Sequence, residues 1–234
     1  VSASMLARDF EPDRLESAKD VAEKFIKARK NDRIGLVVYE GESFTQCPLT
    51  TDHKILIDLL REIKPGMVEG GTAIGMGLAT SVNRLRDSDA KSKVVILLTD
   101  GDNNAGSISP TTAAEIAREF DIRVYTIGVG SRGKALSPVG IFPDGRYRFD
   151  YVDVRIDEEA LQTIAEMTGG KYFRATNSQA LDSIYKEIDL LEKTKINVTE
   201  HSRKAEKYFW FAVVGSCLVF GEYLYRTLIL QTLP

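Results

Sequence analysis

Four residues of the sequence carry side-chain oxygens that could together bind a metal ion. Ser2 and Ser4 stand at alternate positions in VSASM, Thr72 follows a glycine pair, and Asp100 follows the apolar run VVILLT. Hydroxyl and carboxylate oxygens are hard ligands, and this set suits Mg²⁺ or Mn²⁺, which prefer octahedral oxygen coordination and often keep bound water. The sequence therefore predicts a divalent metal site built from these four residues.

Two of these residues also have an ordinary structural interpretation. A threonine before a helix usually caps its N-terminus, which would explain Thr72. An aspartate followed by glycine at the end of a strand is typical of a turn, which would explain Asp100. Gly70 and Gly71 would let the backbone approach an ion closely. The prediction of a metal site therefore rests on the four residues occurring together, and not on any one of them.

The elements that must position these residues alternate between strands and helices. Apolar, β-branched runs predict strands at 33–41, 93–99 and 122–130. Shorter strands are expected at 43–51, ended by Pro48, and at 172–175. Amphipathic patterns predict helices within 13–30, 52–63, 66–87, 112–120, 161–170 and 176–193. The pattern predicts an α/β fold with a doubly wound, mostly parallel sheet and helices on both faces, whose ligands bind at the carboxyl ends of the strands.

A stretch at about 136–154 interrupts this alternation. Its centre, Pro143-Asp144-Gly145, is a turn signal between apolar and aromatic residues, and we interpret the stretch as an inserted hairpin. The hairpin should project from the carboxyl edge of the sheet, near the predicted site. A loop without a function is the alternative.

The carboxyl-terminal tail predicts a membrane anchor. Residues 208–230 are apolar apart from Glu222 and Arg226, with Trp210 and tyrosines toward the ends of the run, as in transmembrane helices. A docked core helix is the alternative. Residues 193–207 would form a charged linker, and their basic residues favour the cytoplasmic side for the domain unless upstream segments override them.

Composition excludes several classes of site. The net charge of −3 and the absence of a basic stripe argue against nucleic-acid binding. The only cysteines, Cys47 and Cys217, and the only histidines, His53 and His201, lie far apart in the sequence. Neither a disulfide framework, a cysteine zinc site nor a histidine-based catalytic triad is expected.

Three separated motifs resemble a known family. SAS near the amino end, GGT before a helix and LLTDG after a buried strand are similar to the metal-ion-dependent adhesion site (MIDAS) of von Willebrand factor A domains. The resemblance covers residues 1 to about 192 and implies the metal ligands Ser2, Ser4, Thr72 and Asp100. NDRIGLVVYEGESFTQCPLTTD and AEMTGGKYFRAT further resemble the BatA-type aerotolerance proteins of bacteria.

The sequence departs from the family pattern at its amino end. The family places an aspartate immediately before the position of Val1, at the end of a first central strand. Neither is present here. We expect this chain to be part of a longer product, with the first central strand missing from it.

The resemblance implies a non-enzymatic interaction module at the bacterial cell membrane. A partner's acidic side chain would complete the coordination of the cation, and the expected partners are a MoxR-type AAA+ ATPase and other A-domain proteins. The residues also allow a metal-dependent phosphoester hydrolase, with Asp100 and Asp102 holding the metal, although no general base or nucleophile stands beside them. An accessory subunit of a metal chelatase is a further alternative.

Overall fold

The computed structural model describes residues 1–67, 70–143, 145–202, 213, 215–216 and 218–222. The chain divides into two compact units, Val1–Leu191 and Glu192–Pro234. The elements follow in the order η1 (Ala3–Leu6), α1 (Arg14–Ala28), β1 (Ile34–Tyr39), β2 (Ser43–Thr50), α2 (His53–Arg61), α3 (Ile74–Leu85), β3 (Lys93–Thr99), α4 (Pro110–Glu119), β4 (Ile122–Val129), β5 (Lys134–Ile141), β6 (Tyr147–Asp153), α5 (Glu158–Met167), β7 (Tyr172–Ala175) and α6 (Ser178–Ser202).

Three strands of the first unit form a parallel sheet in the order β3-β4-β7. The strands β1 and β2 pair antiparallel in a separate two-stranded sheet. The α/β fold with a parallel sheet is confirmed, while the β1–β2 pair departs from the parallel arrangement. The two strands can pair antiparallel because a short turn joins them, whereas parallel neighbours need a crossover such as a helix.

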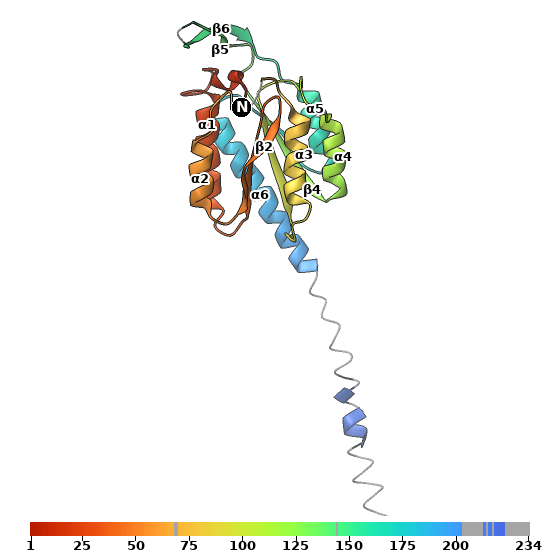
Figure 1. The fold of residues 1–234 in the computed structure, drawn as a ribbon. Helices are drawn as coiled ribbons and strands as arrows, with labels where there is room; N and C mark the ends of the chain where they lie inside the picture. The colour runs from red at the N-terminus through yellow and green to blue at the C-terminus, as the bar shows by residue number, and fades with distance from the viewer. Residues whose placement is uncertain (68–69, 144, 203–212, 214, 217, 223–234) are drawn as a thin grey trace, which may run out of the picture. The chain divides into compact units, whose positions relative to one another are not determined.

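Helices cover both faces of the parallel sheet (Figure 1). Side chains alternate along β4, so that Tyr125, Ile127 and Val129 pack with residues of α1, α2 and α6. Ile122 and Val124 pack with residues of α3, α4 and α5 on the other face. A strand buried on both faces reads as a continuous apolar run, which is why the sequence predicted this layer order.

Strand β2 continues past the proline that was expected to end it. Pro48 lies within Ser43–Thr50, where the pairing with β1 is irregular between Ile34 and Val37. A proline cannot donate to a strand ladder, but an edge strand with an irregular register accommodates it. The prediction that Pro48 ends this strand is therefore wrong.

The strands β5 and β6 form an antiparallel hairpin in the stretch where the insertion was predicted. The backbone N–H of Arg8 donates to the carbonyl of Leu136 at 2.9 Å. The Arg8 guanidinium also stacks over the Phe149 ring, 4.4 Å from its centroid. The hairpin is thereby attached beside the amino-terminal segment, at the same end of the unit (Figure 1).

The predicted membrane segment at 208–230 lies mostly outside the described residues. Within the part that the structure describes, no helix combines the length and the apolar character that a membrane span needs. The helix α6 continues to Ser202 and therefore includes part of the stretch expected as a linker.

Candidate metal centre

The two amino-terminal serines lie against the carboxyl end of β3. Ser2 is the N-cap residue of η1, and its Oγ lies 2.5 Å from Oγ of Ser4. The Ser4 hydroxyl donates to Oδ1 of Asp100 at 3.0 Å, across 96 residues of sequence. The fold thus brings together three of the four residues that the sequence singled out.

Thr72 reaches the same place from the loop before α3. Its backbone N–H donates to Oδ1 of Asn104 at 2.7 Å, and its carbonyl accepts from the N–H of Asn104 at 3.0 Å. Thr72 lines one cavity together with Ser2 and Asp100. The N-cap of α3 is Ala73 and not Thr72, so capping does not explain this threonine.

Steric crowding explains why one position of the pair before Thr72 is a glycine. Gly71 has a φ of +122°, and a Cβ there would lie 2.8 Å from Cβ of Ala105. Gly70 has room for a side chain. Of the pair, only Gly71 therefore needs to be glycine for the loop before α3 to approach the loop after β3.

A buried arginine binds the second carboxylate oxygen of Asp100. The side chain of Arg14, at the start of α1, donates from Nη1 to Oδ2 of Asp100 at 3.0 Å, and both side chains are nearly inaccessible to solvent. The local turn beyond β3 is made by Thr99, whose hydroxyl donates to the carbonyl of Gly101 at 3.2 Å. Asp100 is thus oriented by long-range contacts, so the interpretation as a simple turn former is insufficient.

The same arginine connects the site to the base of the hairpin. Arg14 donates from Nε and Nη2 to the two oxygens of Asp9, at 2.7 Å and 2.6 Å, and Asp9 accepts from the N–H of Ser131 at 2.8 Å. Burial alone would raise the pKa of Asp9, but the hydrogen bond from Arg14 and that from Ser131 lower it below the ordinary value. Burial likewise opposes the charge of Arg14, whereas its carboxylate partners raise its pKa.

A second acidic residue faces the site from β1. Glu40 follows Tyr39 at the end of that strand, is 5% exposed, and lines the same cavity as Thr72 and Asp100. Its Oε2 has no hydrogen-bond partner within the described part of the chain. Burial raises the pKa of Glu40, against lowering by the Val1 amino group and the Gly66 backbone.

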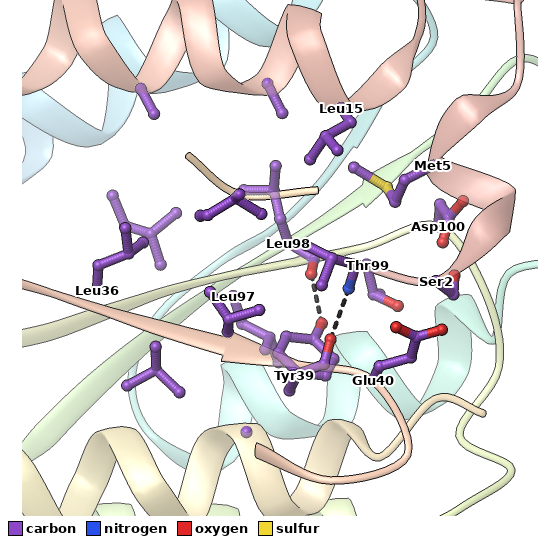
Figure 2. Close-up of a pocket in the computed structure, with 18 of the residues that line it drawn as sticks. Ser2, Met5, Leu15, Leu36, Tyr39, Glu40, Leu97, Leu98, Thr99 and Asp100 are labelled. Carbon is purple, nitrogen blue, oxygen red and sulfur yellow. Dashed lines mark hydrogen bonds between the residues drawn. The ribbon is translucent and has the colours of Figure 1, made fainter. Parts of the chain in front are cut away.

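The cavity itself separates β1 from β3 and has a volume of about 190 Å³. Apolar side chains of both strands line its depth, and the polar residues gather at one end, as Figure 2 shows. The Tyr39 hydroxyl crosses from β1 and donates to the carbonyl of Leu98 on β3.

The donor set fits a hard divalent cation. Hydroxyl and carboxylate oxygens converge from three loops, and one buried carboxylate oxygen of Glu40 lacks a hydrogen-bond partner in the part of the chain that the structure describes. In the described residues, no group of three or more histidine, cysteine, aspartate or glutamate side chains is placed to hold a metal. A metal here would therefore depend largely on hydroxyl ligands and water, a mode that suits Mg²⁺ or Mn²⁺.

Comparison with known proteins agrees with the predicted family and fold. Residues 1–187 match the von Willebrand factor type A domain. The chain belongs to this family. The predicted resemblance to von Willebrand factor A domains is thereby confirmed.

Similar A domains have been solved from Bacteroides. An aerotolerance-related membrane protein from Bacteroides fragilis is 31% identical, with a TM-score of 0.68 over 80% of this chain and 92% of that one. BatB from Bacteroides thetaiotaomicron is 33% identical, with a TM-score of 0.71 over 82% of this chain and 95% of that one. These neighbours agree with the resemblance to aerotolerance proteins of the Bat type.

Curated relatives are more distant and longer. An uncharacterized protein of Borreliella burgdorferi is 27% identical over 99% of this chain and 68% of its own length. The chain spans 58% of a UPF0353 protein from Mycolicibacterium paratuberculosis, to which it is 26% identical over 81% of this chain.

Sequence reasoning missed Arg14 and Glu40. Arg14 stands in the first turn of an amphipathic helix, where a charged side chain is ordinarily solvated, so no local signal marks its burial. Glu40 did carry a signal, because VVYEG repeats the pattern of LLTDG, in which an acidic residue and a glycine follow a buried strand. In this A domain both acidic residues line the same cavity.

Proposed function

We propose that this A domain is a protein-interaction module that binds an acidic group of its partner through a divalent cation. Mg²⁺ or Mn²⁺ would be held by the oxygens of four residues: Ser2, Ser4, Thr72 and Asp100. The bound cation would supply a positively charged coordination position that a partner's carboxylate can fill.

The contact between Ser4 and Asp100 carries this proposal. It joins residues 96 positions apart, and the Ser2 hydroxyl lies beside it, so three oxygen-bearing side chains meet at one point. Arg14 holds the remaining Asp100 oxygen and so limits the orientations of that carboxylate. A ligand set whose orientation is fixed before binding loses little entropy when the ion arrives.

The hydrolase alternative has weaker support. Asp102, which would be its second metal ligand, is exposed, and it is not among the residues that line the cavity. Both oxygens of Asp100 accept hydrogen bonds from neighbouring side chains, which leaves this carboxylate poorly suited to act as a general base. A chelatase accessory subunit would use the same cation site and differs only in its ATPase partner.

The proposed setting is the bacterial cell membrane, with the tail at 208–230 as an anchor and a MoxR-type AAA+ ATPase and other A-domain proteins as partners. Similarity to an aerotolerance-related membrane protein supports this setting. The apolar character of the tail and its aromatic residues support the anchor.

The cation site can be tested by titrating the 234-residue chain with Mn²⁺ and measuring free Mn²⁺ by electron paramagnetic resonance. Asp100→Asn should weaken binding by roughly a hundredfold, because it removes a charged oxygen at the centre of the site. Ser4→Ala should weaken it less, since only one hydroxyl is lost.

The matched control is Asp102→Asn, two positions further along the same loop and exposed. This variant should bind Mn²⁺ as the unaltered chain does. Equal affinity of the Asp100 and Asp102 variants would contradict the proposed site.

A further inference from the structure

Glu40 is a buried carboxylate whose charge the protein only partly compensates. Its side chain is 5% exposed, yet Oε2 has no hydrogen-bond partner within the described residues. Removing an ionised carboxylate from water is strongly unfavourable unless a charge or hydrogen bonds replace the lost hydration. A buried oxygen in this position is available to a positively charged ligand.

The Glu40 side chain lies at the polar end of the cavity, close to Ser2 and Thr99 in Figure 2. Glu40 follows the end of β1 and Asp100 follows the end of β3, so the two carboxylates approach this end from opposite walls.

The side chains around Asp100 carry little net negative charge. Arg14 forms ion pairs with both Asp9 and Asp100, so these three buried side chains carry a single net negative charge between them. Four hydroxyl and carboxylate ligands with so little net charge would attract a divalent cation weakly. An ionised Glu40 adds a second negative charge to those of these side chains, which favours a divalent cation.

We propose that Glu40 is a carboxylate ligand of the cation site, opposite Asp100, and contacts the ion directly or through one bound water. This inference rests on the proposed function, because it assigns a further ligand to the same site. It predicts that the affinity for the metal depends on the charge and the length of the side chain at position 40.

The test compares Mn²⁺ binding by the 234-residue chain and its Glu40→Gln, Glu40→Asp and Asp100→Asn variants, measured by electron paramagnetic resonance. Glu40→Gln keeps the size of the side chain and removes its charge, so binding should weaken roughly ten- to a hundredfold. Glu40→Asp keeps the charge but shortens the side chain by one methylene group. Its affinity for Mn²⁺ should therefore lie between that of the unaltered chain and that of Glu40→Gln.

The matched control is Glu42→Gln, two residues further along the same turn and exposed, which should bind Mn²⁺ normally. Thermal unfolding without metal gives a second readout. Glu40→Gln should melt at the same or a higher temperature, because a desolvated charge has been removed, and Mn²⁺ should raise its melting temperature less than that of the unaltered chain.

The outcomes separate the two proposals. If Glu40→Gln binds Mn²⁺ with unchanged affinity while Asp100→Asn does not, Glu40 is not a ligand and the proposed function stands. If the unaltered chain binds no Mn²⁺, both proposals are wrong. If Glu40→Gln fails to fold, the Mn²⁺ affinity of Glu40→Asp tests the inference instead. An affinity of Glu40→Asp equal to that of the unaltered chain would overturn it.

Discussion

At the scale of single residues, Arg14 has more influence on the site than its position in the sequence suggests. Its guanidinium pairs with Asp9 through two hydrogen bonds and with Asp100 through a third, all away from solvent. Removing one partner of a buried ion pair leaves the remaining charges uncompensated, which is more harmful than losing a surface pair. Arg14 thus couples the stability of the domain to the geometry of Asp100.

Replacing Arg14 by methionine should lower the free energy of unfolding at pH 7 by about 3–5 kcal/mol, because two buried carboxylates lose their counter-ion. The control Arg61→Met removes surface ion pairs from a side chain that is 40% exposed, and should lower it by less than about 1 kcal/mol. Urea unfolding monitored by circular dichroism measures both values.

The effect of the Arg14 variant should depend on pH in a defined direction. The pKa of Asp9 in the folded chain lies below its ordinary value of 3.8, so its stabilising contribution is present above that pH and is lost as the pH falls through the folded value. Without Arg14, burial raises the pKa of Asp9 instead. The carboxyl of the variant then takes up its proton at a higher pH than that of the unaltered chain, so the difference in stability should shrink as the pH falls from 7 through about 4. A difference that grew on acidification would contradict this account.

At the scale of elements, the site depends on contact between two loops. The loop before α3 and the loop after β3 are joined by the hydrogen bonds between Thr72 and Asn104. Gly71 permits their approach through its positive φ and its missing side chain. The strands supply the position of the site, while these loop contacts determine where Thr72 lies within it.

Gly71→Ala should lower the free energy of unfolding by about 1–3 kcal/mol, since alanine at a φ of +122° is strained and its Cβ would lie 2.8 Å from that of Ala105. The variant should also bind Mn²⁺ more weakly, because Thr72 moves with the loop. Gly70→Ala is the matched control, with room for the added methyl group. Similar unfolding curves for the two variants would show that the loop contact is unimportant.

At the scale of the whole molecule, the core of the A domain is contained in Val1–Leu191. Both hydrophobic clusters draw their members from this unit. The proposed anchor lies beyond it, in the second unit. Cation binding and membrane attachment should therefore be separable by truncation.

A chain ending at residue 193 should unfold at the same temperature as the 234-residue chain and bind Mn²⁺ with the same affinity. In bacterial cells the longer chain should remain in the membrane fraction after carbonate extraction, and the shorter chain should be soluble. Release of the longer chain by carbonate would argue against the anchor. Co-purification of the longer chain with a MoxR-type ATPase, and not with a chelatase ATPase, would distinguish the two proposed settings.

Local patterns were sufficient to predict most of the fold and to single out three residues that the structure brings together, Ser2, Ser4 and Asp100. Apolar runs and helical periodicity are properties of neighbouring residues, so the sequence by itself placed the strands, the helices and the layer order around β4. The motifs SAS, GGT and LLTDG likewise indicated Ser2, Ser4, Thr72 and Asp100, because loops at the carboxyl ends of parallel strands converge.

Only the tertiary structure determined which charged side chains are buried beside those residues. Arg14 is 86 residues from Asp100 in the sequence, and its burial follows from the packing of α1 against the end of β3. Glu40 resembles an exposed turn residue until β1 and β3 are placed on opposite walls of one cavity. Burial and charge pairing depend on distances between segments that are remote in the sequence. Those distances are set only when the chain folds, so local sequence patterns do not reveal them.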